Sequence, residues 1–77
     1  MNVRCKFKCI RISENSGGAF EVAFVPVTSG SQENENFWRW TPGGELRLSG
    51  IKKEVAAAFK VDEDFYLDLT PATPAQG

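Results

Sequence analysis

Histidine is absent from this chain of 77 residues, which has only two cysteines and a net charge of −1. Without histidine, the side chain that most often acts as a general base near neutral pH is missing. Zinc sites are built mainly from histidine and cysteine, so two cysteines alone offer too few ligands for a structural site. The low net charge gives no overall attraction to nucleic acid. We therefore expect a protein that is not an enzyme and needs no metal or cofactor.

Long apolar runs are also absent, since none approaches the roughly 18 residues that a membrane-spanning helix requires. The first residues lack the continuous apolar core of a secretory signal. We therefore expect a cytoplasmic protein with no membrane segment. With 42% hydrophobic and 25% charged residues, the composition is that of an ordinary globular chain. Its length predicts one domain at residues 1–70, followed by a flexible tail at residues 71–77 that repeats Thr-Pro.

The two cysteines, Cys5 and Cys9, lie in a stretch where apolar and polar residues alternate, so they share one face of a predicted strand. In an extended strand their Cα atoms would be about 13 Å apart. A disulfide requires a separation below roughly 7 Å. We therefore expect two reduced thiols in the core.

Alternation typical of half-buried strands recurs along the chain. The predicted strands are residues 1–12, 19–27, 37–40, 45–48 and 65–69. Ile10 and Ile12 break the alternation of the first strand, which indicates a bulge or bend. Pro26 cannot donate to a ladder, so we expect it at an edge, a bulge or a strand end.

Between these strands the sequence predicts a loop, a tight turn and a helix. Residues 28–35 are polar and predict a plain connecting loop. Residues 42–44, Pro-Gly-Gly, predict a tight hairpin between the third and fourth strands. Residues 51–59 carry apolar side chains four apart and three alanines, which predicts a short helix. The expected fold is mainly β (α+β), a small five-stranded antiparallel SH3-like barrel or curled sheet, with one short helix between the last two strands.

An aromatic cluster on the third predicted strand is the first candidate site. Trp38 and Trp40 fall on one face of that strand. Phe37 and Arg39 fall on the other face. The core of so short a chain cannot receive the rings of Phe37, Trp38 and Trp40 together. At least one of these rings is therefore expected at the surface as a contact site. With Arg39 and Arg47 beside it, such a ring would suit nucleobases and phosphates, and equally a protein interface.

Arg4, Lys6 and Lys8 share the polar face of the first predicted strand, and we call them the basic strip. One interpretation is a solvated face, or one that pairs across strands with Asp68 and Glu21. The other is contact with phosphates, which would make binding fall steeply with salt.

Three stretches together resemble a group of small proteins encoded in tailed-phage and prophage genomes. They are Ser-Gln-Glu-Asn-Glu-Asn-Phe at residues 31–37, Thr-Pro-Gly-Gly at 41–44 and Phe-Tyr-Leu-Asp-Leu at 65–69. The resemblance covers residues 29–71. That group often has Gly before its last strand, where this chain has Asp-Glu-Asp at residues 62–64. The group has no settled activity, so the resemblance implies a phage setting and a small β fold, and no reaction.

Three hypotheses follow. In the leading one, the chain binds or sequesters a nucleotide or single-stranded nucleic acid, and a tight pocket for such a ligand would need a homo-oligomer. In the second, the same aromatic surface binds and inhibits or recruits a host or phage protein. In the third, the chain is an accessory structural protein of the virion. The site residues of the leading hypothesis are Trp38, Arg39, Trp40 and Arg47, with Arg4, Lys6 and Lys8 of the basic strip.

Overall fold

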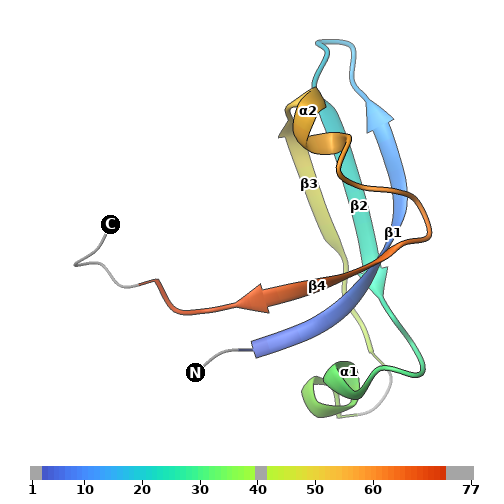
Figure 1. The fold of residues 1–77 in the computed structure, drawn as a ribbon, viewed down its shortest axis with the longest axis vertical. Coiled ribbons are helices and arrows are strands. Elements are labelled where there is room, and N and C mark those ends of the chain that lie inside the picture. Colours follow the sequence, from blue (N-terminus) through green and yellow to red (C-terminus); the bar gives the residue numbers. More distant parts are fainter. Residues whose placement is uncertain (1–2, 40–41, 73–77) are drawn as a thin grey trace.

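A single antiparallel sheet with two short helices makes up the fold in the computed structural model, which describes residues 3–39 and 42–72 (Figure 1). Along the sheet the strand order is β3-β2-β1-β4. The strands are β1 (Val3–Glu14), β2 (Phe20–Pro26), β3 (Leu46–Ile51) and β4 (Asp64–Leu69). The helices are α1 (Gln32–Phe37) and α2 (Lys53–Ala56). Neither of these two helices, in the described residues, is long and apolar enough to cross a membrane.

The sheet curls because β1 is long and changes partner along its length. Residues 3–8 pair with β4, whereas residues 7–14 pair with β2. The β1–β2 ladder shifts its register between Cys9 and Arg11, which is a bulge, and a bulge bends its strand. In Figure 1 the start of β1 and β4 run across the lower ends of β2 and β3. The result is a half-barrel that is open on one side, and the predicted bulge is confirmed.

The concave side of the half-barrel holds the core. Its buried cluster consists of Cys5, Phe7, Cys9, Val22 and Phe24. The ring of Phe24 meets Phe59 and Phe65 edge-on, with centroids 5.6 and 5.8 Å away, an arrangement that aromatic quadrupoles favour. Phe59 belongs to the connection between α2 and β4. The three rings therefore fasten this connection and β4 to β2.

The two cysteines are free and buried, as predicted, with Cys5 1% and Cys9 0% exposed. Burial raises the pKa of both thiols above the ordinary value. Such thiols are weak nucleophiles that pack as small apolar side chains.

Four strands are present in the described residues, where the sequence predicted five. Residues 37–39 do not continue a strand, because Phe37 ends α1 and Trp38 is its C-cap. Trp40 and Thr41 lie outside the described residues. The predicted hairpin at residues 42–44 is wrong, because β3 pairs with β2 instead. The predicted loop at 28–35 is wrong in its second half, where α1 begins after the N-cap Ser31.

The predicted helix at residues 51–59 is much shorter in the structure. Ile51 ends β3, and α2 spans only four residues. After α2 the amide of Phe59 bonds to the carbonyl of Ala56, three residues back, so the chain tightens into turns. This brings Phe59 onto the sheet but leaves Val55 49% exposed. The first hairpin, the final strand and the place of Pro26 at the end of β2 are confirmed.

Candidate interaction surfaces

An apolar groove of about 180 Å³ crosses the concave side between β3 and β4. We call it the concave groove. It is lined by Phe7, Phe24, Leu46, Leu48, Phe59, Phe65, Tyr66 and Leu67. Strand alternation explains this composition, because Leu46 and Leu48 lie opposite the core residues Phe24 and Val22. On β4, alternate apolar residues lie opposite the inward-facing residues of β1.

The rim of the concave groove is open to solvent. Leu48 on β3, which lines the groove, is 38% exposed, and Leu69, which lies beyond the groove at the end of β4, is 51% exposed. Both belong to the inward set by register, since Leu48 lies opposite Val22 and Leu69 opposite Val3. Large apolar side chains gathered along one groove more often mark a contact surface than scattered single ones do.

The two strands that border the concave groove are also the two edges of the sheet. In the described part of the chain, β3 pairs only with β2 and β4 pairs only with β1. No other described backbone group bonds to their outer edges. An edge strand offers a row of unpaired amide and carbonyl groups to any further strand.

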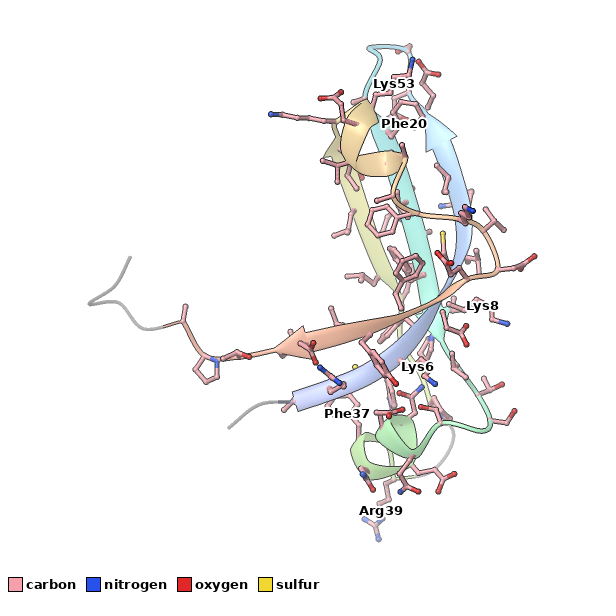
Figure 2. The ribbon with its side chains drawn as sticks, viewed as in Figure 1. Lys6, Lys8, Phe20, Phe37, Arg39 and Lys53 are labelled. Carbon is pink, nitrogen blue, oxygen red and sulfur yellow. The ribbon has the colours of Figure 1, made fainter. Side chains whose placement is uncertain are left out.

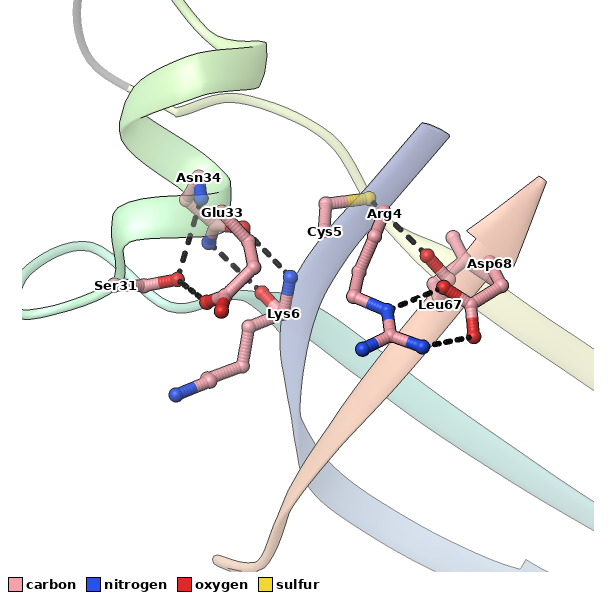
Figure 3. A network of polar contacts seen from close by, with 8 residues as sticks. All are labelled: Arg4, Cys5, Lys6, Ser31, Glu33, Asn34, Leu67 and Asp68. Atoms are coloured by element: carbon pink, nitrogen blue, oxygen red, sulfur yellow. Dashed lines mark hydrogen bonds and ion pairs between the residues drawn. The ribbon is translucent and has the colours of Figure 1, made fainter. Parts of the chain in front are cut away.

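The opposite, convex side of β1 and β4 carries the basic strip. Arg4 lies opposite Asp68, Lys6 opposite Tyr66, and Lys8 is on the same side. Arg4 Nε donates to Asp68 Oδ1 at 2.6 Å and Arg4 Nη2 donates to Asp68 Oδ2 at 3.2 Å (Figure 3). This forked ion pair holds the pKa of Asp68 below its ordinary value. The predicted pairing of the basic strip with Asp68 is confirmed.

Glu21, the other acid predicted to pair with the basic strip, has different partners. Its carboxylate lies 3.1 Å from Arg11 and 3.5 Å from Arg47. Arg47 also pairs with Glu45 at 3.1 Å. The charge of Arg47 is therefore balanced on the outer side of β3. Lys6 and Lys8, which Figure 2 shows along β1, form no ion pair within the described residues.

Tyr66 borders the concave groove, but its ring lies on the convex side with the cations of Arg4 and Lys6. It is 52% exposed, with the guanidinium carbon of Arg4 4.6 Å and Lys6 Nζ 5.5 Å from its ring centroid. These distances are within the range of cation–π contacts. Glu33 on α1 is close enough to Lys6 and Arg4 for their charges to help lower its pKa, after hydrogen bonds from its own backbone and from Ser31.

The predicted aromatic site is arranged differently from the expected strand. Trp38 is half-buried, its ring centroid is 6.1 Å from that of Phe7, and its Nε1 donates to the carbonyl of Gly43 at 3.1 Å. Phe37 is 47% exposed and lies between α1 and the start of β1 (Figure 2). Arg39 is exposed just beyond α1. The exposed ring at this end of the molecule, among the described residues, is therefore Phe37.

A buried amide that sequence reasoning missed holds α1 against the sheet. Asn34 Oδ1 accepts from the backbone amide of Lys6 at 2.6 Å (Figure 3). Asn34 Nδ2 donates to the carbonyls of Lys6 and Val27, both at 2.8 Å. Ser31 Oγ accepts from the amide of Asn34 and so caps the helix. The signal for this cap was a serine followed by acidic residues, which commonly begins a helix.

No protein-family model, curated protein or solved structure matches this chain. Among residues 3–39 and 42–72 no three carboxylates and thiols gather in a way that would hold a metal ion. The surfaces described above are therefore the basis for assigning a function.

Proposed function

We propose that the chain is a non-catalytic protein-interaction module whose concave groove receives apolar side chains of a protein partner. The observation that carries this proposal is the open apolar groove, whose lining residue Leu48 is 38% exposed, with Leu69 51% exposed beyond it on the same side of β4. Burial of such side chains favours association by about 25 cal/mol for each Å² removed from water. The second hypothesis from the sequence also named a protein partner but placed it on the aromatic surface around Trp38, and the leading hypothesis favoured a nucleotide or nucleic acid.

The edges of the sheet support a protein partner as well. A strand added to β3 or β4 would pair with backbone groups that have no ladder partner in the described residues. Strand addition gives affinity through main-chain hydrogen bonds, while a neighbouring apolar groove selects side chains. The groove and the two edges are adjacent, so one partner can use them together.

The charges on the convex side argue against a phosphate-rich partner. The three cations of the basic strip lie with Glu33 and the aspartates of β4. These aspartates are Asp64 and Asp68. Counterion release requires a surface with a clear excess of Lys and Arg. The charges on this side sum to about zero.

Photo-cross-linking inside cells tests the proposed function. We expect benzoylphenylalanine in place of Leu48 to form covalent adducts with protein. The same group in place of Ser49 is the control, because this neighbour on β3 points to the outer side. Adducts from position 48 alone support the proposal. No adduct at position 48, or equal yields from both positions, would overturn it.

A nucleotide or single-stranded nucleic acid remains a second candidate because of one observation. Tyr66 is exposed and has Arg4 and Lys6 at its ring, which is the combination of stacking surface and cation that bases and phosphates use. The site of this candidate is therefore Tyr66 with the basic strip, in addition to the predicted residues around Trp38.

Fluorescence anisotropy of a labelled oligothymidine, with competing nucleotides, checks this second candidate. If it is correct, Tyr66→Ala should weaken binding roughly tenfold, since stacking contributes about 1–3 kcal/mol for each base. Val55→Ala, which removes an exposed apolar side chain on α2, far from α1 in Figure 1, should leave binding unchanged. Absence of binding by the unaltered chain at low salt would exclude this candidate.

A further inference from the structure

We propose that the partner of the concave groove is a second copy of this chain. In this dimer, β3 of each copy pairs with β4 of the other, and two half-barrels close into one eight-stranded barrel with two-fold symmetry. The inference rests on the proposed function, because it requires that the groove binds protein.

The shape of a single copy indicates that a second layer of protein covers its concave side. Its Cα atoms extend 39 × 37 × 17 Å with a radius of gyration of 14.3 Å. A compact chain of this length has a radius of gyration of about 11.5 Å. Among the large apolar residues exposed in the described part of the chain, Leu48 and Leu69 lie on the concave side of β3 and β4. The half-barrel therefore leaves apolar surface that a second layer would cover.

The two edge strands are suited to each other in length and direction. Both β3 and β4 have six residues. Each neighbouring pair in the order β3-β2-β1-β4 is antiparallel, so β3 and β4 have opposite senses within the sheet, although β4 runs across β3 in the curled half-barrel (Figure 1). When two half-barrels face each other, each β3 can therefore add to the partner's β4 as another antiparallel pair. Closure removes every exposed edge from the sheet.

Full overlap of the two strands also gives matching side chains. In this register Leu46 lies opposite Leu69 and Leu48 opposite Leu67, and all four belong to the inward set. Beyond Leu48 the β2–β3 ladder shifts its register, Gly50 has a φ of 72°, and Ile51 packs on the core, so strict alternation in β3 ends at this bulge.

The outer side of the same register brings opposite charges together. Arg47 lies opposite Asp68, and Ser49 lies opposite Tyr66. Asp68 would then sit between Arg4 of its own copy and Arg47 of the partner copy. A slip of one residue would turn one strand's leucines outward, so side-chain alternation excludes odd shifts, and full overlap of the two six-residue strands selects this register among the others.

An eight-stranded barrel also fits the apolar side chains that the groove displays. A barrel of this strand number has an interior just wide enough to be filled by side chains. The groove-lining residues of two copies would fill it, while a single copy leaves Leu48 and Leu69 in water. In a dimer with two-fold symmetry, the same β3–β4 pairing occurs twice and provides both edge strands with a hydrogen-bonding partner. Two-fold dimers are the commonest homo-oligomers.

Sedimentation equilibrium of the full chain at micromolar concentrations is the first test. We expect twice the chain mass of 8.5 kDa. Leu48→Lys should raise the dissociation constant roughly a hundredfold or more, because the buried leucine is lost twice in a symmetric dimer. Ser49→Lys, on the outer side of the same strand, should remain a dimer. Circular dichroism establishes that both variants keep the sheet.

A disulfide test checks the register. We expect the double variant Ser49→Cys with Tyr66→Cys to form a covalent dimer on oxidation, because these positions lie opposite each other across the proposed pair. Ser49→Cys with Asp64→Cys moves one thiol by two positions and should give much less. The native thiols are buried and do not compete.

The outcomes separate this inference from the proposed function. A monomer whose position 48 cross-links to other proteins overturns the dimer and leaves the interaction module in place. A monomer with no adduct at position 48 overturns both. Assemblies that grow beyond two copies overturn the closed barrel, because the β3–β4 contact would then be open-ended. Equal disulfide yields from the two double variants contradict the register.

Discussion

Replacing Phe24 with alanine should lower the free energy of unfolding by about 3–5 kcal/mol. Phe24 is 3% exposed and lies where β2 faces both β4 and the connection after α2. Its ring contacts Phe59 and Phe65, whose own centroids are 5.2 Å apart. Removal of the Phe24 ring leaves a cavity where Phe59 and Phe65 pack against β2. Urea unfolding, followed by tryptophan fluorescence at one fixed protein concentration, measures the loss.

This loss is large for so short a chain. At roughly 0.05–0.15 kcal/mol per residue, the total stability is about 4–12 kcal/mol. Phe37→Ala is the matched control, because that ring is 47% exposed and contacts Trp38 from the surface. We expect it to cost below about 1 kcal/mol. Similar losses from the two substitutions would show that the three rings around Phe24 are not the centre of the core.

The parts of the fold that the sequence predicted are those with strong alternation. The first hairpin, the bulge near Cys9 and the final strand all follow from which residues can point inward. The pairing of Arg4 with Asp68 follows from the same alternation, once β1 and β4 are neighbours. In these segments local pattern and tertiary contacts agree, so the sequence alone is sufficient.

The third predicted strand failed because a tertiary contact outweighed local propensity. The aromatic residues from Phe37 onward favour a strand. However, Ser31 caps a helix that begins before them, and Asn34 fastens that helix to backbone groups of β1 and of the segment after β2. No residue pattern within the helix predicts that distant contact. Once α1 forms, Trp38 is turned toward Phe7 as part of the core edge.

The concave groove was also beyond prediction, although each of its lining residues lies in a segment that the sequence predicted as a strand or helix. Alternation states which side of a strand faces inward, but it does not state whether that side is covered. The sequence predicted a hairpin that pairs the strand at residues 45–48 with the one at 37–40, whereas the structure places Leu48 opposite Val22 with an open edge beside it. The site therefore depends on which strands pair, and this order is set by all the long-range contacts together.

Replacing Asn34 with alanine should release α1 from the sheet and cost about 2–4 kcal/mol of unfolding free energy. The substitution leaves the amide of Lys6 and the carbonyl of Val27 without their partners. A buried polar group left without its partner costs about 1–3 kcal/mol. The carbonyl of Lys6 is less affected, because it also accepts from the amide of Val27 at 3.1 Å. Urea unfolding measures the loss.

Asn36→Ala is the control on the same helix, because this exposed side chain bonds only to Gln32 among the described residues. We expect it to change the free energy of unfolding by less than about 0.5 kcal/mol.

The Asn34→Asp variant keeps the size of the side chain and changes only its hydrogen bonds, so it measures what these bonds contribute to stability. Its carboxylate can still accept from the Lys6 amide, but it cannot donate to the two carbonyls that Asn34 Nδ2 contacts at 2.8 Å. Those carbonyls disfavour the charged form, so the pKa of the new carboxyl in the folded chain should rise above about 3.9, the value for an unfolded chain. The loss of unfolding free energy is therefore largest at pH values above the pKa that this carboxyl has in the folded chain. It becomes smaller as the pH falls through that pKa, because the protonated carboxyl can donate one hydrogen bond. Relative to the unaltered chain, the urea midpoint of this variant should therefore recover between pH 7 and pH 4. A deficit that is the same at both pH values would mean that the two carbonyls do not depend on Asn34 for their hydrogen bonds.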